Sequence, residues 1–129
     1  MDAVHVLDAS ALLAVLNQEA GMDVVLPLLP GALMSAVNWS EVVQKALARN
    51  VPASLQMREH VEAAGVDILP FEVEDAESAA LVWQRAPRHG LSLGDRACLA
   101  LAQARGATAV TADRGWAQLS VGVEVLVIR

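Results

Sequence analysis

Four acidic side chains occupy positions where this chain is expected to change direction or to begin a helix. Asp8 and Asp113 each end a short apolar run. Asp95 opens an apolar helical stretch, and Glu41 lies in the first turn of another. If the apolar runs are strands of one parallel sheet, the residues just past their carboxyl ends face the same crevice. The carboxylates would then meet there and form a site for a divalent metal ion.

Each acid also has a purely structural interpretation. Asp8 suits the N-cap of the helix that follows it, and Asp113 suits the start of a turn. Asp95 lies three residues after Ser92, which is the spacing of a capping box. Glu41 precedes a lysine by four residues, an order that gives a weak helical ion pair. For any one acid alone, capping or solvent exposure is the more frequent role, so the metal-site hypothesis depends on all four together.

Electrostatics favours the metal-site interpretation if the four acids converge. Two carboxylates about 5 Å apart repel each other by about 3 kcal/mol at an effective dielectric constant of about 20. Capping does not require this cost, because serine and threonine also cap helices. A site made only of carboxylates selects Mg²⁺ or Mn²⁺ rather than Zn²⁺. Such an ion, in a chain without a phosphate-binding P-loop motif, suits hydrolysis of a phosphodiester bond.

Apolar periodicity predicts an alternation of strands and helices that would position these acids. The expected strands are residues 4–7, 32–35, 66–71, 109–112 and 123–128, and the expected helices are residues 10–18, 23–29, 38–49, 52–64, 74–84 and 94–105, with a helical turn at 115–119. Pro52 is expected in the first turn of its helix. This alternation predicts an α/β fold with a parallel sheet covered on both faces. The length of 129 residues predicts one domain, residues 1–129.

Composition limits the classes of function. The net charge of −6 gives no general basic surface for nucleic acid. It does not exclude nucleic-acid binding, because a bound Mg²⁺ would reverse the local field around the acids. The single cysteine, Cys98, is expected to be a buried apolar filler in a reducing compartment. No signal peptide or membrane span is expected, and a soluble, cytoplasmic protein is predicted.

Four segments of the chain resemble the motifs of a known family in order and spacing. They are residues 6–12 (VLDASAL), 35–42 (SAVNWSEV), 91–102 (LSLGDRACLALA) and 111–116 (TADRGW). The chain resembles the PIN-domain ribonucleases, and specifically the VapC-type toxins of bacterial toxin–antitoxin pairs, over its whole length. The resemblance implies a three-layer α/β/α fold with a five-stranded parallel sheet and an endoribonuclease that uses Mg²⁺ or Mn²⁺. It also implies an RNA substrate, a homodimer and a small antitoxin partner.

The resemblance further implies roles for individual residues. The metal would be held by four acids: Asp8, Glu41, Asp95 and Asp113. Ser10, Asn38 and Thr111 would support these acids through hydrogen bonds, as outer residues of metal sites commonly do.

Contacts to RNA are less specified by the sequence. The candidates for phosphate contact are Arg96, Arg114, Arg85 and Arg88, although solvated surface charge is the more frequent role of such residues. Trp116 follows Asp113 closely and is a candidate for stacking on a base. Trp39 and Trp83 lie at apolar helical spacing and are expected in the core. Several apolar residues of the expected helices are more than the core can be expected to bury, and if they are exposed they would form an apolar patch that marks a partner site. The alternative is that all of them pack inside the protein. These residues are Leu26, Leu28, Leu29, Leu55 and Met57.

Two alternatives remain open from the sequence. One is a PIN-type nuclease that is not a toxin and acts on DNA or structured RNA. The other is a non-catalytic PIN-like module that binds protein. A small upstream reading frame for a DNA-binding antitoxin would distinguish the toxin from the first alternative, and metal-linked stabilisation would distinguish it from the second.

Overall fold

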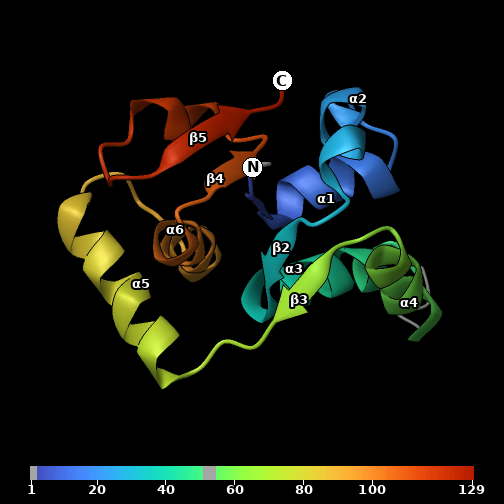
Figure 1. The fold of residues 1–129 in the computed structure, drawn as a ribbon, viewed down its shortest axis with the longest axis horizontal. Coiled ribbons are helices and arrows are strands. Elements are labelled where there is room, and N and C mark those ends of the chain that lie inside the picture. Colours follow the sequence, from blue (N-terminus) through green and yellow to red (C-terminus); the bar gives the residue numbers. More distant parts are fainter. Residues whose placement is uncertain (1–2, 51–54) are drawn as a thin grey trace.

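A five-stranded parallel sheet forms the centre of the molecule in the computed structural model, which describes residues 3–50 and 55–129 (Figure 1). The strand order is β3-β2-β1-β4-β5, and all four neighbouring pairs are parallel. The order reverses between β1 and β4. In open α/β sheets, the crevice for a ligand lies at such a reversal, outside the carboxyl ends of the strands.

The strands and helices alternate as the apolar periodicity predicts. The strands are β1 (His5–Leu7), β2 (Leu33–Ser35), β3 (Asp67–Leu69), β4 (Thr108–Thr111) and β5 (Glu124–Val127). The helices are α1 (Ala9–Leu16), α2 (Met22–Val25), α3 (Ala36–Ala48), α4 (Leu55–Ala63), α5 (Val73–Arg85) and α6 (Leu93–Arg105), with 3-10 turns η1 (Leu26–Leu28) and η2 (Arg114–Gln118). The start predicted for the fourth of these helices, at Pro52, lies outside the described residues.

Helices cover both faces of the sheet and bury separate apolar clusters. Leu7 of β1 and Val110 of β4 pack with α1, α2, α3 and α4 on one face. The preceding residues, Val6 and Ala109, pack with α5, α6 and η2 on the other face. Successive side chains of a strand point to opposite faces, so both faces of these short central strands must be apolar. The predicted three-layer α/β/α fold is therefore confirmed.

Local capping fixes where several helices begin and end. The Asp8 side chain accepts a hydrogen bond from Ala11 N and caps α1. Ser92 and Asp95 form the predicted capping box at the start of α6. Gly106, with φ of 59°, ends α6 in the left-handed conformation that glycine adopts without strain. The first turns of α1 and α6 are thereby held at defined positions near the sheet.

The structure differs from the sequence expectation in two helices. The single helix expected at residues 23–29 is split into α2 and η1, since Pro27 has no N–H to continue an α-helical hydrogen-bond pattern. Trp83 of α5, expected in the core, is 52% exposed, because α5 buries Ala79 and Val82 and turns the following residue outward. Of the leucines that could exceed the capacity of the core, Leu26 is exposed and Leu29 is buried. No helix within the described ranges has the length and apolar character to cross a bilayer.

Candidate metal centre

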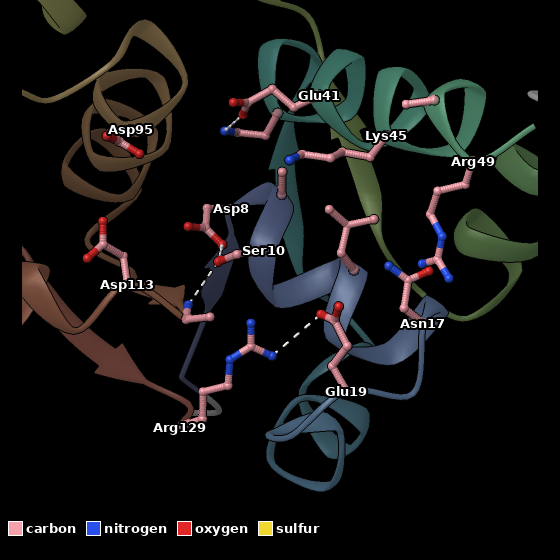
Figure 2. Close-up of a pocket in the computed structure, with 15 residues that line it drawn as sticks. Asp8, Ser10, Asn17, Glu19, Glu41, Lys45, Arg49, Asp95, Asp113 and Arg129 are labelled. Atoms are coloured by element: carbon pink, nitrogen blue, oxygen red, sulfur yellow. Dashed lines mark hydrogen bonds and ion pairs between the residues drawn. The ribbon is translucent and has the colours of Figure 1, made fainter.

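The four candidate acids line one cavity at the carboxyl edge of the sheet. The cavity has a volume of about 610 Å³ and lies at the β1–β4 reversal of strand order. Asp8 enters it from the end of β1 and Asp113 from beyond β4, while Glu41 comes from α3 and Asp95 from α6 (Figure 2). Residues far apart in the chain thus face the same space.

Asp8 is the most buried of these acids, with 7% of its surface exposed. Its Oδ1 accepts hydrogen bonds from Ser10 Oγ at 2.7 Å and from Ala11 N at 2.9 Å. Its Oδ2 accepts one from Thr111 Oγ1 at 2.5 Å. Three donors therefore fix the orientation of the carboxylate. Burial raises the pKa of Asp8 above its ordinary value and the charge of Asp95 adds to this, although the three hydrogen bonds oppose the shift.

Ser10 and Thr111 connect Asp8 to the segment that follows β4. Ser10 Oγ accepts a hydrogen bond from Ala112 N at 2.9 Å, and Thr111 Oγ1 accepts one from Asp113 N at 3.0 Å. Thr111 is fully buried. Each hydroxyl thus donates to Asp8 and accepts from the backbone leading to Asp113, so the two acids are positioned by one hydrogen-bond network.

Glu41 is positioned by contacts between α3 and α6. Asn38 Nδ2 donates to Glu41 Oε1 at 2.9 Å and to the carbonyl oxygen of Gly94 at 3.0 Å. A Cβ built on Gly94 would lie 2.7 Å from both Cδ and Oε2 of Glu41, and closer still to Oε1. The Glu41 carboxylate therefore occupies the space that a side chain at residue 94 would take.

Asp95 and Asp113 have the structural roles that the sequence left open, and they face the cavity as well. Asp95 Oδ2 accepts a hydrogen bond from Ser92 N at 3.0 Å, which completes the capping box. Asp113 Oδ1 accepts one from Gly115 N at 2.9 Å, at the start of η2. Capping and lining of the cavity thus coexist in the same side chains, because each cap uses only one carboxylate oxygen.

The negative charges of the site change the pKa of one buried side chain in the core, the thiol of Cys98. Burial raises the pKa of the Cys98 thiol well above its usual range, and the charges of Asp8, Asp95 and Glu41 raise it further. Cys98 is fully buried in α6, with Sγ 3.9 Å from the carbonyl oxygen of Val6. Three of the acids that line the cavity therefore raise the pKa of the same buried thiol.

The residues fit a hard divalent cation by chemistry, but not as a tight cage. Within residues 3–50 and 55–129, no three His, Cys, Asp or Glu side chains lie close enough together to hold one metal ion among them. Mg²⁺, however, is usually bound through one or two carboxylates and keeps several waters. The cavity offers oxygen donors of this kind. Asn38, which also lines the cavity, has a buried Oδ1 without a hydrogen-bond partner in the described part of the chain.

None of the predicted RNA-contact residues is among those that line this cavity. Trp116 is 2% exposed within the apolar cluster of α5 and α6, so the suggestion that it stacks on a base is wrong. The 3-10 turn η2 packs against that cluster through Trp116. Arg96 Nη1 donates to the carbonyl oxygen of Ala79 on α5, and Arg114 Nε donates to that of Arg129. Neither arginine lines the cavity.

Other charged residues line the cavity and were not singled out from the sequence. They are Lys45 and Arg49, which follow one another along and just beyond α3, Arg129, and Glu19, which pairs with Arg129 at 3.5 Å. The sequence signal that could have identified Lys45 and Arg49 is their spacing from Glu41 at intervals of four. Residues with this spacing share one face of a helix, so they can line the same cavity as Glu41. Gly94 was also missed as a residue that makes room for Glu41.

Comparisons with known proteins agree on one family and fold. The family model described as PIN domain matches residues 5–122. Three similar solved structures are a toxin–antitoxin complex from Klebsiella pneumoniae (TM-score 0.75, 19% identity, 97% of this chain and 98% of that chain), DNA-bound VapBC from Salmonella typhimurium (0.72, 17%, 99% and 100%), and Mycobacterium tuberculosis VapC20, described as a sarcin–ricin loop cleaving toxin (0.67, 18%, 93% and 98%). No curated protein matches the chain. At these identities the structural likeness establishes the fold.

Proposed function

Because the chain belongs to the PIN domain family, we propose that it is a metal-dependent endoribonuclease that acts as the toxin of a toxin–antitoxin pair. One observation carries the proposal. Four carboxylates from separate parts of the chain line one cavity at the carboxyl edge of the parallel sheet, at the reversal of strand order.

Asp8, Asp95 and Asp113 would hold Mg²⁺ or Mn²⁺ directly or through water molecules, with Glu41 completing the shell, since no three of these side chains lie close enough together to bind one ion. Bound there, the ion would supply positive charge against the scissile phosphate and lower the pKa of the attacking water. Asp8 is the best fixed of the four, since three donors orient it, and we assign it a direct contact to the ion. The hydrogen bonds of Ser10 and Thr111 fix Asp8 relative to the backbone of residues 112 and 113, and Asn38 donates a hydrogen bond to Glu41.

Asp95 and Asp113 each keep one carboxylate oxygen free for chemistry at the phosphate. Asp95 uses Oδ2 in its cap, and Asp113 uses Oδ1. The other oxygen of either residue is available to accept a proton from the attacking water as a general base. The proposed reaction is hydrolysis: water adds to phosphorus, the P–O bond to the leaving nucleotide breaks, and the leaving oxygen gains a proton.

The antitoxin partner is supported by the surface and by the neighbours. Two mostly apolar cavities of about 210 and 90 Å³ adjoin Leu16 of α1, which is itself exposed. Exposed apolar surface of this kind marks protein interaction sites. The similar structures from Klebsiella and Salmonella are described as a toxin–antitoxin complex and as DNA-bound VapBC. We propose that a cognate antitoxin covers this region, and that the toxin acts in the cytoplasm as a homodimer.

Removal of the metal is expected to abolish RNA cleavage. The wild-type protein should cleave total RNA with Mg²⁺ or Mn²⁺, lose this activity in excess EDTA, and regain it when metal is restored. Without the ion, no metal lowers the pKa of the attacking water or offsets the repulsion between the carboxylates and the scissile phosphate. Gel analysis of the RNA measures the result. Cleavage that survives EDTA would reject the metal-dependent mechanism, and cleavage of DNA but not RNA would favour the non-toxin nuclease.

A second candidate, the non-catalytic PIN-like module, is favoured by one observation: no tight metal cage exists among the described side chains. Metal-linked stability distinguishes the two. The nuclease is expected to gain about 2.7 kcal/mol in the free energy of unfolding when Mn²⁺ is present at about 100 times its dissociation constant. Thermal unfolding across a Mn²⁺ series measures this, with a monovalent salt at equal ionic strength as the control. A melting temperature independent of Mn²⁺ would support the binding module.

A further inference from the structure

The wall of the cavity formed by the C-terminal half of α3 carries positive charge. Lys45 and Arg49 line the cavity together with the carboxylates. With Arg129, they make three of the chain's nine Lys and Arg residues, concentrated in a protein of net charge −6. Figure 2 shows the Lys45 side chain extending from α3 toward the carboxylates, while Arg49 follows directly after the C-terminal end of that helix. The stretch of this wall that follows Glu41 thus adds two positive charges to the cavity that the carboxylates line.

Neither of these two cations is neutralised within the part of the chain that the structure describes. In residues 3–50 and 55–129, Lys45 and Arg49 take part in no ion pair and no side-chain hydrogen bond, although Glu41 is one turn from Lys45. Arg129 differs, because its Nη1 contacts Glu19 and donates to the carbonyl oxygen of Ala20. Among the described residues, the two cations of α3 therefore keep their donors free for an anionic ligand in the cavity.

The spacing of these two residues suits a chain of phosphates. Residues four apart on a helix lie on one face and are separated by about 6 Å along its axis. That separation is comparable to the distance between neighbouring phosphates of an extended single strand. A strand that places one phosphate at the carboxylates would pass Lys45 and then Arg49 as it leaves along α3.

We propose that Lys45 and Arg49 bind successive backbone phosphates of a single-stranded RNA next to the phosphate held at the carboxylates. The inference rests on the proposed function and adds to it the direction in which the strand leaves the site. Lysine and arginine bind phosphate through charge-assisted hydrogen bonds, and such contacts position the strand without reading its bases. Arg96 and Arg114 donate to the carbonyl oxygens of Ala79 and Arg129, do not line the cavity and have no part in this path.

The test measures binding separately from cleavage. A short labelled single-stranded RNA of mixed sequence is titrated with the Asp8→Asn protein in EDTA over a KCl series, and fluorescence anisotropy gives the dissociation constant. Lys45→Met and Arg49→Met are then introduced together in this background. Arg58→Met with Arg105→Met is the matched control, because it removes two exposed charges outside the cavity. Thermal unfolding checks that each variant is folded.

We expect the Lys45→Met and Arg49→Met protein to bind the RNA on the order of tenfold or more weakly at low salt. The magnitude of the slope of log K against log[KCl] should fall by about 0.7 for each phosphate that is no longer bound, and so by about 1.4 for the pair. The control pair should change neither quantity substantially, and Lys45→Arg should retain the binding. Equal weakening by both pairs would show a general charge effect and overturn the proposal. An unchanged slope, or no RNA binding by the Asp8→Asn parent at any salt, would overturn it too.

These outcomes separate the inference from the proposed function. Metal-dependent RNA cleavage by the wild-type protein, together with normal binding by the double variant, would leave the nuclease in place and reject only the strand path. RNA binding that depends on Lys45 and Arg49, without any cleavage by the wild-type protein, would reject the nuclease and retain the binding site.

Discussion

Replacement of Asp8 by Asn is expected to reduce RNA cleavage on the order of 1,000-fold while making the metal-free protein more stable than the wild type. Loss of activity follows from removing the charge of the best-oriented ligand of the proposed ion. Stability is expected to rise because the wild-type protein keeps a buried carboxylate near Asp95, and the asparagine has nearly the same shape without the charge. We expect a gain on the order of 1 kcal/mol in the free energy of unfolding at neutral pH in EDTA.

The pH dependence of this gain has a defined sign. Burial raises the pKa of Asp8 in the folded protein above its ordinary value, so the folded state binds the proton more tightly than the unfolded state. The wild type therefore loses stability as pH rises from the ordinary aspartate range through the raised pKa. An asparagine side chain at this position does not titrate, so the advantage of Asp8→Asn should grow across that window and become constant above it.

Denaturation of both proteins in EDTA at several pH values measures this difference. Asp67→Asn is the matched control, because Asp67 is exposed at the start of β3 and loses the same charge outside the cavity. With saturating Mn²⁺ the order of stability should reverse, since only the wild type gains from binding the ion. An Asp8→Asn protein that is active, or that is less stable than the wild type in EDTA at every pH, would contradict this account.

The positions of the acids could be predicted because each depends on a local signal and one topological rule. Asp8 follows an apolar strand and caps α1, and these signals lie within a few residues of it. The rule for parallel sheets then brings the ends of two strands together, and β1 and β4 are indeed paired. The spacing of a capping box likewise predicts that Asp95 lies in the first turn of a helix, which is α6. Local chemistry predicts the element that carries each of these acids, whereas the strand order that brings them to one cavity is a property of the folded sheet.

Side chains whose environment depends on how a helix packs could not be predicted equally well. Trp83 and Trp116 both have apolar neighbours in sequence, yet one is exposed and the other buried. The difference arises from which face α5 and η2 turn to the core. Lys45 and Arg49 line the cavity only because α3 packs beside α1 and α6 with that face toward the cavity. The direction of a helix relative to the sheet is a tertiary property, and periodicity does not specify it.

Replacement of Gly94 by Ala is expected to reduce RNA cleavage on the order of 100-fold with little loss of stability. A Cβ at this position would lie 2.7 Å from Oε2 and Cδ of Glu41, which is too close for both groups to remain in place. Glu41 has a flexible side chain, so its carboxylate can move away at small cost to the fold. Displacement of a catalytic group by about 1 Å can lower the rate about 100-fold.

Stability and activity should therefore respond to this substitution in different ways. Gly94 lies in the first turn of α6 without a positive φ, so alanine is compatible with its backbone. Alanine is favoured over glycine in a helix by up to about 1 kcal/mol, which offsets the cost of moving Glu41. The melting temperature of Gly94→Ala is expected to lie near that of the wild type, in contrast to the large fall in cleavage.

A double-mutant cycle with Glu41→Ala shows whether Gly94 acts through Glu41. In the Glu41→Ala background no carboxylate remains to be displaced, so Gly94→Ala should have no further effect on kcat/KM and should raise the melting temperature. If the two losses in kcat/KM multiply instead, Gly94 affects the site by another route, such as a shift of α6 that carries Asp95. The coupling distinguishes these cases because Asp95 lies on the same helical turn as Gly94, whereas Glu41 belongs to α3.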